Sequence, residues 1–113
     1  MPNPLNYYEL NAQIADIGTA SVVYFAAPLS GSLKELRCTI FGGITTADDV
    51  ITVAVDGTNL SPTLTVPFSG SAAGTTVVAQ FNAPVRAGSR ITVSNSGAST
   101  GTTPAAYTLT LQG

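Results

Sequence analysis

The chain alternates apolar and polar residues in short blocks, and glycine, proline, asparagine and serine separate one block from the next. Residues 50–56 show the pattern most clearly, because Ile51, Val53 and Val55 occupy every second position and therefore share one face of an extended strand. Signals for helices are nearly absent. This pattern is typical of a β-sandwich or barrel, so we predict an all-β protein.

About seven or eight short strands are expected from these blocks. The predicted strands with the clearest boundaries span residues 20–27, 33–41, 50–56, 63–68, 75–81, 91–93 and 107–111. Their turn signals recur at the spacing of an antiparallel sandwich. We therefore predict an antiparallel, jelly-roll-like β-sandwich over residues 20–113.

Several residues give specific expectations within these strands. The strand at residues 33–41 should turn three apolar side chains inward: Leu36, Cys38 and Ile40. Leu33 is out of phase with this set, which predicts a β-bulge near Lys34 or Glu35. Asp56-Gly57 predicts a hairpin turn.

Proline affects two further expectations. In the strand at residues 63–68, the side chains expected to face inward are Leu64, Val66 and Phe68. Pro62 and Pro67 place this strand at a sheet edge, because proline donates no hydrogen bond to a neighbouring strand. Residues 83–89, which include Pro84, are expected to form a turn.

Residues 1–19 differ from the rest of the chain, because Pro2 and Pro4 oppose regular structure and no turn folds this segment back at once. We predict an N-terminal arm here, followed by the sandwich domain of residues 20–113. The arm packs on its own sandwich, docks on a neighbouring subunit or is disordered, and the sequence leaves these alternatives open. Its apolar and amphipathic side chains are the predicted partner contacts: Leu5, Tyr7, Tyr8 and Leu10.

The low charge of the chain suggests that much of its surface lies against partners. Only 9% of the residues are charged, against about 25% in an ordinary soluble protein. We therefore predict a homo-oligomer and favour a trimer. The four basic residues form no basic stretch, so nucleic-acid binding is not expected. No apolar run approaches the roughly 18 residues of a membrane span, so no membrane partner is expected.

Two features indicate where the chain folds. Its first residues show neither the basic region nor the apolar run of a signal peptide. Cys38 is the single cysteine, so it has no partner for an intrachain disulfide, and its apolar surroundings in the sequence predict that it is buried. Both features favour folding in a reducing cytoplasm.

The residues that most enzymes need are missing. Histidine is absent, which removes Ser-His-Asp and Cys-His catalysis and the commonest metal ligand. One cysteine cannot supply a zinc site, and no phosphate-binding glycine motif is present. Asp48 and Asp49 lack the spacing of a calcium loop, so we expect them to lie in a solvated loop or to cap a turn. We predict no enzymatic activity, no cofactor and no metal.

Five segments of the chain fit one further pattern: residues 23–33 (VYFAAPLSGSL), 43–53 (GITTADDVITV), 70–74 (GSAAG), 85–93 (VRAGSRITV) and 96–100 (SGAST). Together they resemble small virion proteins encoded by tailed bacteriophages, over roughly residues 20–111. The segments build a sandwich and carry no functional motif. Such proteins often have aspartate where this chain has Ser89, a departure that falls in a turn.

The resemblance implies a non-enzymatic phage structural protein, and within that class a capsid decoration (cement) protein that binds the outer surface of the head and stabilises it. The implied partners are further copies of the chain, as a homotrimer, and the major capsid protein. The implied location is the virion surface, after synthesis in the cytoplasm of the host bacterium. The alternative is a tail-fibre or baseplate module that recognises host carbohydrate. A small secreted adhesin is a third hypothesis, disfavoured by the missing signal peptide.

Overall fold

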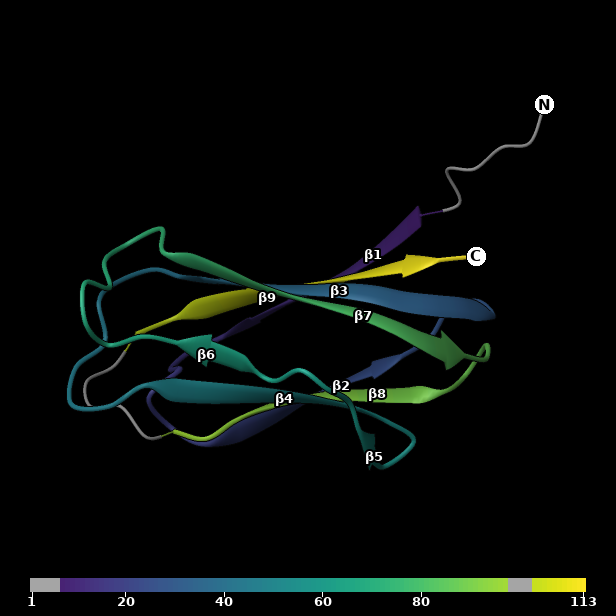
Figure 1. The fold of residues 1–113 in the computed structure, drawn as a ribbon, viewed down its shortest axis with the longest axis horizontal. Coiled ribbons are helices and arrows are strands. Elements are labelled where there is room, and N and C mark those ends of the chain that lie inside the picture. Colours follow the sequence, from purple (N-terminus) through teal and green to yellow (C-terminus); the bar gives the residue numbers. More distant parts are fainter. Residues whose placement is uncertain (1–6, 98–102) are drawn as a thin grey trace.

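The computed structural model describes residues 7–97 and 103–113, and within these residues it contains strands and no helix. The strands form two antiparallel sheets that pack face to face (Figure 1). Sheet A contains, in spatial order, β1 (Tyr7–Ile14), β9 (Ala105–Gln112), β3 (Gly31–Ile40) and β7 (Thr76–Val85). Sheet B contains β2 (Ser21–Ala26), β8 (Arg90–Asn95), β4 (Asp49–Val55), and β5 (Thr58–Asn59) and β6 (Leu64–Val66), which both pair with β4.

The strand order is that of a jelly roll. Without the two-residue strand β5, the sheets read β1-β9-β3-β7 and β2-β8-β4-β6, so consecutive strands of the chain mostly change sheet. The predicted all-β antiparallel sandwich is confirmed. In the part of the chain that the structure describes, no helix is long and apolar enough to cross a membrane.

The core lies between the two sheets and is built by alternate residues of each strand. Sheet A contributes a large part of it: Leu33, Leu36, Cys38, Ile40, Ala105, Tyr107, Leu109 and Leu111. From sheet B, Ile51 and Val53 of β4 and Ile91 and Val93 of β8 meet this layer. Burial of Ile51, Val53 and Cys38 confirms the predicted inward faces, whereas Val55 is only half-buried.

Two predicted local features are also confirmed. The register of β3 shifts between Leu33 and Glu35 against both of its neighbours, β7 and β9, which is the predicted bulge. Asp56 and Gly57 both have positive φ, 49° and 87°, and they join β4 to β5. This backbone conformation is that of a two-residue hairpin turn.

The expectations that involved proline were confirmed only in part. Among the described strands β6 pairs with β4 alone, which is the predicted edge position, and Leu64 and Val66 are buried as expected. Strand β6 ends at Val66, so Phe68 lies beyond it and is exposed to solvent. Strand β7 continues through Pro84 to Val85, where a turn was expected. Among the described strands, β7 is the outermost strand of sheet A and has a neighbour on one side, and an edge strand is the position in a sheet where proline is tolerated.

The segment predicted as an extended arm contains a strand. Tyr7–Ile14 form β1, which pairs along its whole length with β9 of the same chain, with Leu10 opposite Leu109. Of the alternatives that the sequence left open, packing on the chain's own sandwich is the one that the structure contains for these residues. Leu5 lies outside the described residues.

Candidate partner-contact surfaces

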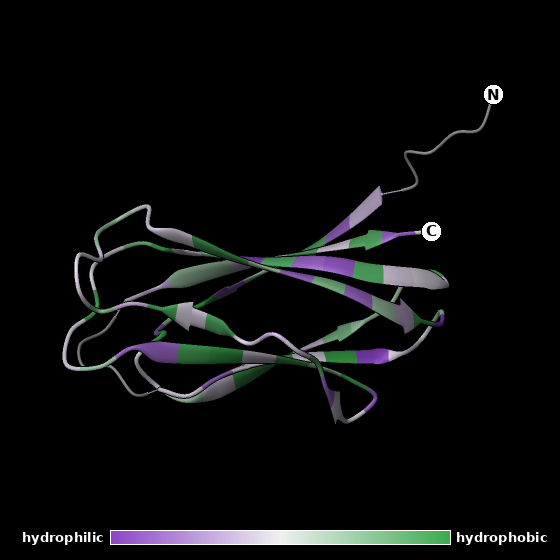
Figure 2. Ribbon diagram, viewed as in Figure 1, coloured by the Kyte–Doolittle hydropathy of each residue, from purple (hydrophilic) through white to green (hydrophobic). Residues whose placement is uncertain are grey.

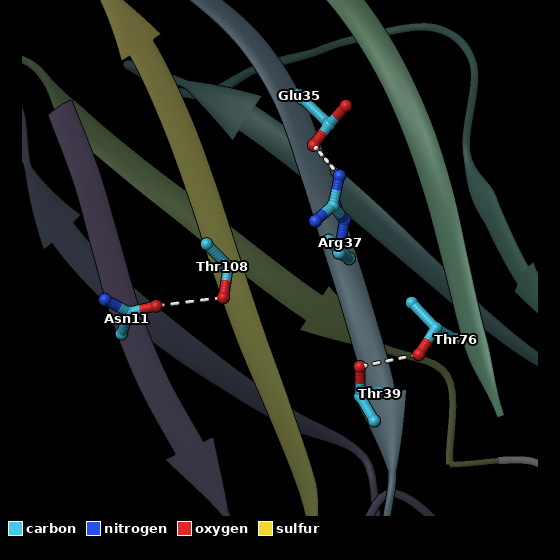
Figure 3. A network of polar contacts seen from close by, with 6 residues as sticks. All are labelled: Asn11, Glu35, Arg37, Thr39, Thr76 and Thr108. Atoms are coloured by element: carbon cyan, nitrogen blue, oxygen red, sulfur yellow. Dashed lines mark hydrogen bonds and ion pairs between the residues drawn. The ribbon is translucent and has the colours of Figure 1, made fainter. Parts of the chain in front are cut away.

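The outer face of sheet A is polar and carries a network of side-chain contacts. The register places charged and polar residues from all four strands on it: Glu9 and Asn11 of β1, Thr108, Thr110 and Gln112 of β9, Glu35, Arg37 and Thr39 of β3, and Thr76, Gln80 and Asn82 of β7. Figure 3 shows three contacts on this face, each 2.9 Å long. Arg37 forms an ion pair with Glu35, Thr39 bonds to Thr76, and the Thr108 hydroxyl donates to Asn11 across strands β9 and β1.

A pocket of about 400 Å³ lies at one end of this face. All four strands of sheet A line it, with Tyr7 from β1, Lys34 and Glu35 from β3, Gln80 from β7, and Thr110 and Gln112 from β9. Phe81, which is almost fully buried, also borders it.

The bulge in β3 explains the chemistry of this pocket. Leu33 and Leu36 are both buried, so the two residues between them, Lys34 and Glu35, point to the outer side together. The hydrogen bonds agree with this assignment: Lys34 Nζ donates to Asn82 Oδ1 over 2.9 Å, and Glu35 accepts from Arg37 over 2.9 Å. The bulge therefore places a cation and an anion side by side at the pocket.

The outer face of sheet B has a different composition. Its residues are small, β-branched or aromatic: Val22, Tyr24 and Ala26 of β2, Thr92 and Ser94 of β8, and Val50, Thr52 and Ala54 of β4. Tyr24 is 68% exposed, and Val22 and Val50 are exposed as well. Arg90, at one end of β8, is the one charged residue that the described strands place on this face. Figure 2 shows the same contrast, with β4 and β8 hydrophilic mainly at their ends.

The sandwich is open on the side where β1 and β2 lie. Each of these strands pairs on one side only, β1 with β9 and β2 with β8. A cavity of about 350 Å³ lies at the end of β1, and its lining comes from Ile14 of β1, from Ala15, Asp16 and Thr19 of the following loop, and from Ser21, Val22 and Val23 of β2. Asp16 holds this corner, because its carboxylate accepts hydrogen bonds from the backbone N–H of Gly18 and of Thr103.

The structure separates the residues predicted as partner contacts. Tyr7 and Tyr8 are both about half exposed, but they point to opposite faces of sheet A. Tyr7 lies on the outer face, and Tyr8 lies on the inner face, where sheet B does not cover it fully. Leu10 is half-buried and packs against the core, so it is a core residue at the sheet edge. The sequence interpretation did not single out Tyr24 and Val22, although both alternate with the inward residues Val23 and Phe25.

Asp49 differs from the solvated loop residue that the sequence predicted. It is the first residue of β4 and is fully buried, and its Oδ1 accepts from Ser96 Oγ at 2.8 Å and from Gly97 N at 3.0 Å. Asp48 remains in the preceding loop and accepts from Phe68 N at 3.0 Å. The expected solvated loop position is therefore confirmed for Asp48 and wrong for Asp49.

Asp49 belongs to a group of buried polar side chains in the core. Burial, and then the nearby charge of Asp49, raise the pKa of the Cys38 thiol to about 12. Burial also raises the pKa of Tyr107, with Cys38 as the next cause. Asn95 lies close enough to oppose this shift, yet Tyr107 Oη and Asn95 Oδ1 both lack a hydrogen-bond partner. A thiol with such a high pKa is protonated at neutral pH and is a poor nucleophile.

Within residues 7–97 and 103–113, no group of three or more cysteine or acidic side chains is arranged to hold a metal ion. The candidate sites described above are the two outer faces and the pocket on the outer face of sheet A.

No protein-family model matches the chain, and no curated protein does. Among solved structures, the catalytic unit of a thermostable GH87 α-1,3-glucanase from Streptomyces thermodiastaticus is similar over 96% of this chain and 26% of that chain, with 14% identity and a TM-score of 0.56. Dimeric latent PorU from Porphyromonas gingivalis matches over 96% of this chain and 13% of its own, at 12% identity and a TM-score of 0.51.

A family 35 carbohydrate-binding module from Clostridium thermocellum is similar over 96% of this chain and 89% of that chain, at 16% identity and a TM-score of 0.49. This chain thus spans about a quarter of the glucanase unit and a smaller part of PorU. At identities this low, the likenesses to the glucanase unit and to PorU show a shared fold and nothing of function.

Proposed function

We propose that this protein is a non-enzymatic structural component of a tailed-phage virion, a decoration protein that binds the outer surface of the head through the outer face of sheet B. The observation that carries the proposal is the composition of that face. It exposes Tyr24, Val22 and Val50, and Arg90 at one end is the one charged residue that the described strands place there.

Such a face suits contact with a protein surface better than contact with water. The centres of protein interfaces are depleted of charged residues and enriched in aromatic ones, because burying an unpaired charge is costly. Tyr24 offers a large apolar ring with one polar tip, and the threonine and serine hydroxyls around it can donate or accept hydrogen bonds. The sequence resemblance to small virion proteins supports the identity of the partner, a major capsid protein.

Attachment is tested by a matched pair of substitutions. Val22 on sheet B and Val78 on sheet A are both 46% exposed. Val22→Asp places a charge on the proposed contact face, and Val78→Asp places the same charge on the opposite face. We expect Val22→Asp to weaken binding to heads that lack the protein by about tenfold or more, whereas Val78→Asp binds like the wild type.

Co-sedimentation of purified protein with such heads measures this difference, and circular dichroism verifies that both variants fold. Equal binding by the two variants would contradict the proposal that sheet B is the contact face. Immunogold labelling of intact virions distinguishes the head location from the tail-fibre or baseplate alternative. Labelling confined to the tail would overturn the decoration role.

The same proposal includes a homotrimer on the particle. A symmetric trimer contacts its particle at several sites at once. Its overall affinity is therefore much higher than that of any single contact. Light scattering at micromolar concentration, free and after release from the particle, should give a mass three times that of the chain. A monomer under both conditions would refute the trimer. The contact face would still be tested separately by the binding of Val22→Asp.

A further inference from the structure

The pocket on the outer face of sheet A combines an aromatic ring with a mixed set of hydrogen-bonding groups. Tyr7 stands at its rim and is 51% exposed. Gln80 and Gln112 each supply a carbonyl acceptor and an amide donor, and the Thr110 hydroxyl can act in either sense. Its volume of about 400 Å³ lies within the usual range for small-molecule sites, about 300–1,000 Å³.

The bulge of β3 completes this set with one pure donor and one pure acceptor. The Lys34 ammonium donates only, and the Glu35 carboxylate accepts only. Both are held in place by neighbours outside the pocket, Lys34 by Asn82 and Glu35 by Arg37. Because four paired strands supply the lining, the backbone positions that carry these groups are fixed before any ligand arrives, which lowers the entropic cost of binding.

Vicinal hydroxyl groups are the ligand chemistry that matches this arrangement. Each hydroxyl both donates and accepts, so it can bond to an amide, to a carboxylate and to an ammonium group, while the apolar face of a sugar ring packs on an aromatic side chain. An anionic ligand such as a phosphate or a uronic acid would meet the Glu35 carboxylate, whose repulsion offsets the attraction of Lys34.

We propose that this pocket binds a neutral saccharide, with Tyr7 as the stacking platform and Lys34, Glu35, Gln80 and Gln112 as the hydroxyl-binding groups. The site lies on the face opposite the proposed particle contact. It stands on the geometry of sheet A alone and does not depend on attachment to a phage head.

The test uses the full chain on a printed array of neutral hexose oligosaccharides beside sialylated and uronic-acid oligosaccharides. We expect retention of neutral glycans, and titration of the best of these as a free oligosaccharide then gives the affinity. Tyr7→Ala and Gln112→Ala should each weaken binding about tenfold. Tyr7→Phe should retain it, because the ring is kept.

Tyr24→Ala is the matched control, since it removes an exposed tyrosine from sheet B and should leave glycan binding unchanged. Circular dichroism verifies the fold of every variant. The proposal is overturned if no neutral glycan is retained above the level of Tyr7→Ala, if only acidic glycans bind, or if Tyr24→Ala weakens binding as much as Tyr7→Ala does. Loss of binding in both Tyr7→Ala and Gln112→Ala with an intact fold supports it.

Discussion

The two outer faces of the sandwich are built by the same strand alternation, yet they differ in charge. Of the ten charged residues of the chain, four lie on the outer face of sheet A: Glu9, Lys34, Glu35 and Arg37. One, Arg90, lies on the outer face of sheet B. The remaining charges lie in loops and turns, apart from the buried Asp49.

This difference shows that a low overall charge need not be spread evenly over a surface. The composition predicted a surface largely covered by partners, and the structure confines the uncharged part to one side. On the polar side, Arg37 forms an ion pair with Glu35, and Lys34 donates a hydrogen bond to Asn82. A protein with one charged and one uncharged face is suited to bind a partner through its uncharged face while its charged face remains in contact with solvent.

The largest expected effect tests whether the faces of sheet B are assigned correctly. Val53 points inward and is 1% exposed, whereas its neighbour Thr52 belongs to the outer face. Val53→Asp buries an unpaired charge at a cost of about 3–5 kcal/mol or more, comparable to the whole stability of a small domain. We expect loss of cooperative thermal unfolding by circular dichroism for Val53→Asp and a folded protein for Thr52→Asp. Equal tolerance of both substitutions would invalidate the comparison of faces.

A smaller effect is expected at the two neighbouring aspartates. Asp49→Ala removes a fully buried acceptor and leaves the Ser96 hydroxyl and the Gly97 amide without their part-buried hydrogen bonds, and should cost about 1–3 kcal/mol. Asp48→Ala removes one hydrogen bond at the surface and should cost less than about 1 kcal/mol. Urea denaturation measures both free energies of unfolding. A larger loss for Asp48→Ala would show that burial does not govern the difference.

Acid should weaken the corner that links the two sheets. Hydrogen bonds from the Thr19 hydroxyl, and then from the amides of Thr103 and Gly18, hold the pKa of Asp16 below its ordinary value of 3.8. A lowered pKa in the folded state means that Asp16 stabilises the fold at pH values above 3.8, and that this contribution is lost as the pH falls through the lower folded value.

We therefore expect Asp16→Asn to lower the melting temperature at neutral pH and to make little difference at the most acidic pH at which the protein folds. Melting curves of the two proteins between about pH 2 and 6 measure this convergence. A difference in melting temperature that stays constant over this range would contradict the role given to the ionised carboxylate.

The smallest effect is expected on the charged face itself. Arg37→Ala removes an ion pair in which the arginine side chain is about half exposed, so it should change the free energy of unfolding by less than about 1 kcal/mol. The change should shrink further at high salt. A loss of several kcal/mol in urea denaturation would mean that the polar network of sheet A supports the fold as well as the surface.

The sequence predicts those features that depend on strand alternation alone. Ile51 and Val53 were placed inward by their spacing, and Leu33 revealed the bulge because it fell out of phase. Proline was harder to interpret, because its effect depends on which strand lies beside it. Pro62 and Pro67 correctly indicated the edge position of β6, whereas the strand through Pro84 was missed because the local pattern does not show that β7 is an edge strand.

The candidate sites depend even more on the register between distant strands. Tyr7, Glu35, Gln80 and Gln112 meet at one pocket only because β1, β9, β3 and β7 pair in that order. Burial of Asp49 likewise depends on Ser96 and Gly97, which come directly after β8, the strand beside β4. Local patterns indicated the bulge and most strands, although not β1, and they contained no information on these pairings.

The free edge of β2 has a consequence for the solubility of the isolated chain. Ser21–Ala26 has no charged residue and no proline, is rich in β-branched and aromatic side chains, and pairs only with β8. Segments of this composition are prone to add strands from other molecules, and proteins usually protect them with a charge or a covering segment. Glu9 provides such a gatekeeper on β1, and β2 has none. When the protein is produced at high concentration without its partners, β2 is therefore the segment at which aggregation should begin.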